Sequence, residues 1–154
     1  MRLTIISTPI GFLGSGRGGG VELTLNSLVS GLLKQNHFIN VVAPINSILS
    51  ESCSSANLFT VAGYEQKSWQ HQNYYTRTEN SEGSVVNLMS EKALSLMKDS
   101  DAIINLSYDL MPISKTLEID FPIVHLISMG DESLEISNII SKVYSHYPNN
   151  FAFH

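Results

Sequence analysis

The 154-residue chain has a single cysteine, a single tryptophan and few charged residues, which make up 15% of it. Cys53 has no second cysteine to pair with, so the chain can form no internal disulfide. No apolar run approaches the roughly 20 residues that a membrane-spanning helix needs. The formal net charge is −5, whereas nucleic acids and anionic membranes attract positive charge. We therefore expect neither a membrane span nor a nucleic-acid partner.

In other respects the composition is that of a globular domain. Hydrophobic residues make up 43% of the chain, and a chain of this length can bury a core of its own. An apolar run begins at the first residues, without the pattern of a signal peptide. The predictions are a single domain over residues 1–154 and a cytoplasmic location.

The most unusual stretch is the glycine-rich segment 8–20, which reads TPIGFLGSGRGGG. The short apolar run before it, 3–7, is typical of a buried strand. After it, four apolar residues recur at spacings of four, three and four, which places them on one face of a helix. They are Val21, Leu25, Leu28 and Leu32. The sequence thus predicts a strand, a glycine-rich loop and the start of a helix.

This arrangement predicts a site for a phosphate, another anion or a sugar. Glycine lets a ligand approach the main chain, and the first amides of a helix lack partners within the helix and lie at its positive end. The predicted phosphate- or sugar-binding residues are Arg17, Gly18, Gly19 and Gly20. The alternatives are a turn without a ligand and, for Arg17, a solvated side chain. Glu22, in the first helical turn, is expected to cap the helix or order the loop, with a catalytic role as the alternative.

The rest of the chain alternates between predicted strands and helices. The strands are expected at 38–44, 58–62, 101–106, 122–127 and 151–154, and the helices at 86–97, 111–117 and around 136–143. This alternation predicts a doubly wound, Rossmann-like parallel sheet with helices on both faces. The last strand looks cut short at residue 154, so we expect a piece of a longer protein.

In such a sheet, ligands bind beyond the carboxyl ends of the strands. Asp109 follows the fourth strand, where it could act as a base or accept a hydrogen bond, or instead cap the next helix. His125 lies inside the apolar fifth strand, where an interior role is the alternative to a catalytic one. The polar segment 64–84 has no helix or strand period and predicts an excursion over this edge. Its aromatic residues Trp69, Tyr74 and Tyr75 could stack on the flat ring of a bound molecule or pack against the domain.

Two segments at the start and in the later part of the first predicted helix resemble glycosyltransferase family 4, whose members start this helix with Gly-Gly-x-Glu and end it near a small-residue/Leu pair. They are GGGVEL at 18–23 and LVSGL at 28–32. Two later stretches, 101–112 and 122–130, agree with the family in place and character. The resemblance covers nearly the whole chain, as the N-terminal half of a two-domain GT-B enzyme. Within the family, the longer pattern GSGRGGGVE resembles the cyanobacterial glucosyltransferases that act on tetrahydrobiopterin.

The resemblance implies transfer of a sugar, glucose in that subgroup, from a nucleotide-sugar such as UDP-glucose to a small-molecule acceptor, with retention and without a metal or other cofactor. It implies that this half binds mainly the acceptor, while its glycine loop approaches the donor diphosphate. A C-terminal domain, absent from this sequence, would hold most nucleotide contacts, so the fragment alone is expected to be inactive.

On the same basis the acceptor-binding residues are Tyr108, Asp109, Ser128, Met129 and Gly130. Asp109 and His125 are the candidate catalytic residues. Many family members have a histidine just after the fifth strand. This chain reads ISMG at 127–130, with its histidine inside the strand instead.

The alternative is a stand-alone α/β module that binds or regulates without catalysis, of the flavodoxin or response-regulator type. A response regulator needs an acidic pair after its first strand, where this chain reads TPIG. A flavodoxin phosphate loop would be rich in serine and threonine. A nicotinamide-dependent enzyme would need an acidic residue at the end of the second strand, where this chain reads APIN.

Overall fold

The computed structural model describes residues 1–65, 83–128 and 134–153. Six strands form one sheet in the order β3-β2-β1-β4-β5-β6, and every neighbouring pair is parallel. The strands are β1 (Arg2–Ile6), β2 (Phe38–Pro44), β3 (Asn57–Val61), β4 (Ala102–Asn105), β5 (Ile123–Ile127) and β6 (Phe151–Phe153). The chain therefore has the Rossmann-like α/β fold that the alternation predicted.

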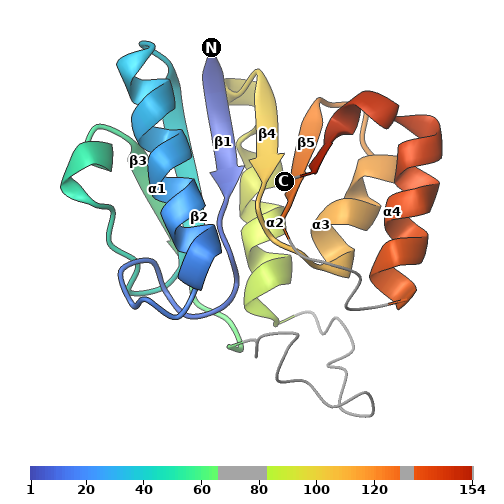
Figure 1. The fold of residues 1–154 in the computed structure, drawn as a ribbon, viewed down its shortest axis with the longest axis horizontal. Helices are drawn as coiled ribbons and strands as arrows, with labels where there is room; N and C mark the ends of the chain where they lie inside the picture. The colour runs from blue at the N-terminus through green and yellow to red at the C-terminus, as the bar shows by residue number, and fades with distance from the viewer. Residues whose placement is uncertain (66–82, 129–133, 154) are drawn as a thin grey trace.

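Within the described ranges, four α-helices and several 3-10 turns connect the strands. They are α1 (Gly19–Lys34), η1 (Glu51–Cys53), α2 (Val85–Ser95), η3 (Met97–Asp99), α3 (Leu110–Ser114), η4 (Lys115–Leu117), α4 (Leu134–His146) and η5 (Pro148–Asn150). Figure 1 shows α1 against the β2–β3 side of the sheet, and α3 and α4 beside β5 at the other end. No helix of the described part is long and apolar enough to cross a bilayer.

Alternation along the central strand divides the core into two layers. Ile5 packs with the α1 residues Leu25 and Val29 on one face, while the next residue, Ile6, packs with Met89 of α2 on the other. Successive strand residues point to opposite faces, so α1 and α2 cover opposite sides of β1. A third cluster, centred on Ile113 and Ile127, joins α3 and α4 to the end of β5.

Most predicted boundaries lie within two residues of the observed ones. The helix after the glycine loop begins at Gly19 rather than at residue 21. The predicted helix 111–117 divides into α3 and the 3-10 turn η4. The predicted excursion 64–84 falls largely on residues 66–82, outside the described residues, together with Trp69, Tyr74 and Tyr75.

The strand order reverses beside β1, the first strand of the chain. From β1 it proceeds to β2 and β3, and then α2 carries it back across the sheet to β4, on the other side of β1. This is the Rossmann order, whereas flavodoxin-like sheets have the order 2-1-3-4-5. The topology of this sheet therefore differs from the flavodoxin-like one, while a stand-alone binding or regulatory role stays an alternative prediction. In the Rossmann order, the crevice beyond the carboxyl ends of β1 and β4 is the expected ligand site.

Candidate functional site

The glycine-rich loop runs from the end of β1 to the start of α1, and most of its glycines have a structural reason. Four have a left-handed φ: Gly11 (67°), Gly14 (93°), Gly16 (73°) and Gly19 (55°). Other residues rarely adopt this region. Gly18 has a φ of −72°, but a Cβ there would lie 2.9 Å from Thr8 Cγ2. The turn and its packing therefore account for these five glycines.

Gly20 has no such reason. It lies in the first turn of α1 with an ordinary φ, it is exposed, and a Cβ there would meet nothing within 4 Å. Alanine would be more favourable in a helix by up to about 1 kcal/mol. What the glycine does provide is open access to the main chain at the helix N-terminus, which is what an approaching ligand requires.

The N-terminus of α1 also lacks a side-chain cap. The N-cap residue is Gly18, and no side chain of the described residues caps the helix. The contact from the Gly19 amide to the Gly16 carbonyl is long, at 3.4 Å. Uncapped amides at the positive end of a 16-residue helix can donate to an anion or a polar ligand on the exposed side of the loop.

Glu22 orders the loop from its inner side. Its carboxylate is largely buried, at 9% exposed, and Oε1 accepts a 2.6 Å hydrogen bond from the Gly14 amide. The expectation that Glu22 orders the loop is therefore confirmed. Its other oxygen, Oε2, is buried without a partner in the described part of the chain. Because this negative charge occupies the inner side, an anion is favoured only on the outer side, where Gly16, Gly19 and Gly20 are open.

Asp109 and Tyr108 follow β4 but are buried. Asp109 is 2% exposed and caps α3, with Oδ1 accepting from the Met111 amide at 3.5 Å. The capping alternative is therefore confirmed, while a role as a base stays a prediction. Tyr108 packs with Ile113 and Ile127, so its contact with an acceptor also stays a prediction. Ser128 is exposed at the end of β5, while Met129 and Gly130 lie outside the described residues.

His125 lies in the interior, with none of its surface exposed. Its Nδ1 is 3.0 Å from Asn105 Nδ2, and its Nε2 is 2.8 Å from Thr116 Oγ1. The Asn105 amide is oriented by the Ser107 amide, which donates to Asn105 Oδ1. Asn105 Nδ2 is therefore the donor to Nδ1, and His125 carries its proton on Nε2 and donates to Thr116.

Burial lowers the pKa of His125 to about 4, because a charged imidazole is unfavourable in an apolar interior. The neutral ring joins β4, β5 and η4 through two hydrogen bonds. This geometry supports the interior alternative and gives no support to a catalytic role, which remains a prediction without structural backing.

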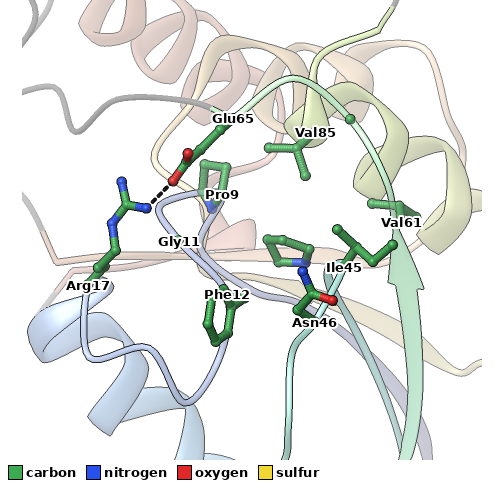
Figure 2. Close-up of a pocket in the computed structure, with 11 residues that line it drawn as sticks. Pro9, Gly11, Phe12, Arg17, Ile45, Asn46, Val61, Glu65 and Val85 are labelled. Carbon is green, nitrogen blue, oxygen red and sulfur yellow. Dashed lines mark ion pairs between the residues drawn. The ribbon is translucent and has the colours of Figure 1, made fainter.

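A pocket of about 280 Å³ lies on the other side of the glycine loop, at the carboxyl ends of β2 and β3. Figure 2 shows the side chains of Phe12, Ile45, Val61 and Val85 around it. The loop contributes Pro9, Gly11 and Phe12, the end of β2 contributes residues 44–46, and β3 and its extension contribute Val61, Gly63 and Glu65. The sequence prediction did not include this pocket.

Arg17 forms an ion pair with Glu65 beside this pocket (Figure 2). Both side chains are 58% exposed, so water weakens their attraction and the pair adds little stability. Arg17 is thus largely exposed to water, as the alternative of a solvated side chain expects, and it is also paired with Glu65. Its pairing with a phosphate remains a prediction, and a phosphate would have to compete with Glu65 for it.

Three pocket residues lie in loops that the sequence places at the carboxyl ends of the strands, but none of the three was singled out as a site residue. Ile45 and Asn46 follow directly after the second strand, at the edge where ligands bind. Glu65 lies just beyond the third strand and within the segment that was interpreted as an excursion. Nothing in the sequence indicated that Arg17, 48 positions earlier, would be its partner.

The fold and the glycine loop together define a Rossmann-like α/β domain with an open helix N-terminus at the carboxyl edge of its sheet. The chain matches no model of a known protein family and no curated protein. Within the described residues, no group of three or more histidine, cysteine, aspartate or glutamate side chains could hold a metal ion. The function must therefore be argued from the geometry.

Proposed function

We propose that this chain is the acceptor-side, N-terminal half of a retaining family 4 glycosyltransferase with the GT-B architecture. It would help move a sugar, glucose on the resemblance of its loop, from a nucleotide-sugar to a small-molecule acceptor, for which a pterin is the first candidate. A second domain would supply most contacts to the nucleotide. The observation that carries the proposal is Gly20, an exposed glycine at an uncapped helix N-terminus that the fold itself does not require.

The chemistry needs positive potential where charge develops. As the bond between the sugar and the diphosphate breaks, negative charge accumulates on the leaving phosphate. The uncapped amides at the start of α1 could donate to that phosphate or to the sugar beside it, and the helix dipole adds a favourable field. These donors are fixed in a helix, so they need no rearrangement during the reaction.

Glu22 determines the side of the loop on which an anion is favoured. By accepting from the Gly14 amide it holds the loop in place, and its charge disfavours an anion on the inner side. The diphosphate is therefore expected on the outer side, over Gly19 and Gly20, while the sugar hydroxyls point toward the crevice between β1 and β4. Both parts of the donor would then approach the main chain closely, which side chains at these positions would prevent.

The proposal is tested by replacing Gly20 with alanine. No clash opposes the new Cβ, and the helix should become more stable by roughly 0.5–1 kcal/mol. If a donor approaches here, the added methyl displaces it, and kcat/KM for sugar transfer should fall by about 10- to 100-fold, because transfer tolerates little displacement. Transfer is measured as UDP release from UDP-glucose with tetrahydrobiopterin, using the protein encoded by the whole reading frame.

Gly31→Ala is the matched control. Gly31 lies in the same helix, away from the loop, and a Cβ there would also meet nothing within 4 Å. This variant should gain similar stability and keep full activity. Equal activity in the two variants would refute the donor-approach argument. A reading frame that ends at His154, with no transfer by the chain, would refute the enzyme proposal and favour a stand-alone binding module.

A further inference from the structure

Half of the sheet is covered by helices on only one of its faces. Because crossovers are right-handed, α1 lies on one face of the sheet and the later helices α2, α3 and α4 lie on the other. Figure 1 shows α1 in front of the β2 side of the sheet, whereas no helix of the described ranges lies in front of β4. Parallel sheets are almost always covered on both faces, so the α1 side of β4 and β5 should have a partner.

This uncovered surface, which we call the β4–β5 face, is apolar. Side chains alternate along a strand, so Ala102, Ile104, Val124 and Leu126 point to the α1 side. All four are only partly buried, whereas Ile103, on the other face of β4, has no exposed surface. None of the four carries a charge. A molecule that covers them therefore removes apolar surface from water without burying a charged group of this face.

The outer side of α1 is poor in charge. A surface helix typically carries charged residues opposite its apolar stripe. Apart from the two glycines at its start, the exposed residues of α1 are Leu23, Ser27 and Lys34. Leu23 is 69% exposed, and Lys34 lies in the last turn. Most of this side can therefore pack against an apolar surface without burying a charge.

A two-fold axis parallel to the strands would join these two surfaces. With the α1 sides of two copies turned toward each other, each α1 lies over the β4–β5 face of the other copy, and the two helices form one layer between two sheets. An axis across the strands would instead place the two helices on top of each other. Asn26 faces η1, so Leu28, two positions later, points to the opposite flank. That flank is where the two helices would meet.

The charges at the amino end of the sheet agree with this arrangement. Because α1 runs from the carboxyl end of β1 to the amino end of β2, Lys34 in its last turn lies near the amino ends of the strands. Asp101 and Asp120 precede β4 and β5 at the same end, and both are exposed. The two-fold arrangement brings Lys34 of each copy toward these carboxylates of the other. Their attraction favours this register of the two copies.

From these observations we infer that the protein associates with a second copy of itself through the α1 side of its sheet, so that each α1 covers the β4–β5 face of the other copy. With 16 residues, α1 is about 24 Å long and about 10 Å wide. Two helix–sheet contacts and the contact between the helices would bury roughly 1,000–1,400 Å², enough for a weak, specific dimer with a Kd on the order of 1–100 µM. This inference goes beyond the proposed function, because association requires neither donor nor acceptor.

The test is analytical ultracentrifugation of the protein encoded by the whole reading frame, over about 1–300 µM, which brackets the expected Kd. The wild-type protein should change from monomer to dimer over this range. Leu23→Lys should weaken the dimer by at least about 10-fold, because the dimer would bury an unpaired charge. Ile48→Lys is the matched control. Ile48 is also exposed, at 70%, but it lies in the loop after β2, so this variant should dimerise like the wild type.

A mixing experiment tests whether the packing is reciprocal. Leu126→Glu should also weaken the dimer by at least about 10-fold, since it places a charge on the β4–β5 face. In a heterodimer of Leu23→Lys with Leu126→Glu, one contact pairs lysine with glutamate and the other keeps both leucines. Native mass spectrometry of the mixture should detect this heterodimer at a concentration where each variant alone is a monomer. Circular dichroism checks that Leu126→Glu is folded.

Lys34→Glu is a second variant that leaves the sheet unchanged. It should weaken the dimer by about 3- to 10-fold at low salt, because it turns an attraction to Asp101 and Asp120 into a repulsion. A protein that stays monomeric over the whole range would overturn the inference, since another segment would then cover the face, and so would a dimer that Leu23→Lys leaves intact. Absence of the heterodimer from a mixture of two folded variants would refute the reciprocal packing. None of these measurements depends on sugar transfer, so this inference and the proposed function can fail separately.

Discussion

Protonation of His125 should make the stability of this protein fall steeply on mild acidification. The pKa of this histidine is lowered from 6.5 to about 4 in the folded protein, while in the unfolded chain it returns to its ordinary value. Between these two values the unfolded chain binds more protons than the folded one, so the free energy of unfolding decreases as the pH falls. The stabilisation is complete above pH 6.5 and is lost progressively down to about pH 4.

The size of the effect follows from the shift. A difference of about 2.5 pKa units corresponds to about 3 kcal/mol in total, of which about 2 kcal/mol is lost by pH 5. The cause of the lowered pKa is burial, which disfavours the charged imidazole, and Nδ1 also faces the Asn105 amide at 3.0 Å. A proton on Nδ1 would place two donors against each other inside the sheet. For a domain of this length, 2 kcal/mol lowers Tm by about 4–8 °C.

The assay is urea unfolding between pH 5 and pH 8, followed by circular dichroism, for the wild-type protein and His125→Gln. Glutamine does not titrate and keeps a donor and an acceptor, so the other titrating groups contribute almost equally to both curves. The variant should be less stable at pH 8, and its free energy of unfolding should fall less than that of the wild type toward pH 5. Parallel curves for the two proteins would refute the reasoning.

Two further predictions concern carboxylates at the ligand-binding edge. Asp109→Ala should lower the free energy of unfolding by about 1 kcal/mol through loss of the α3 cap, and Asp109→Asn should restore most of it. If Asp109 is also a catalytic base, both variants should lose sugar transfer. An Asp109→Asn enzyme that still transfers sugar would exclude the role as a base and leave helix capping as the role of Asp109. Glu22→Ala should leave the Gly14 amide without its acceptor and lower stability by about 1–3 kcal/mol. Hydrogen exchange at Gly14 should accelerate in that variant, and unchanged exchange would contradict the role of Glu22 in ordering the loop.

Local patterns in the sequence were enough to predict most of the fold. The second strand, 38–44, matches the observed β2, because its apolar run is bounded by the polar residues 35–37 and by Pro44. The spacing of apolar residues after the glycine loop likewise predicted that Leu25 lies on the buried face of α1, whereas the buried Val29 was not among the predicted residues. The other three predicted residues, Val21, Leu28 and Leu32, are partly buried against the same core. Such signals depend on neighbours in the chain, and parallel strands with intervening helices have few ways to pack.

The sequence left open the roles of individual site residues, because these depend on neighbours that are distant in the chain. His125 is interior because Asn105 and Thr116 enclose it, and Arg17 is paired because β3 brings Glu65 to the glycine loop. Asp109 could have been a base or a cap from its position alone, and only the Met111 amide identified the cap. The pocket is likewise a product of packing, since its walls come from separate segments.

The sequence by itself determined the order of strands and helices and the glycine loop at the start of the first helix, because both follow from backbone preferences and short-range periodicity. The tertiary structure decided which glycines the turn requires. Gly11 and Gly19 are required by a left-handed φ and Gly18 by its contact with Thr8, whereas Gly20 is free of both constraints. A glycine looks the same in the sequence whatever its φ and surroundings, and these are set only when the loop packs against β1 and α1.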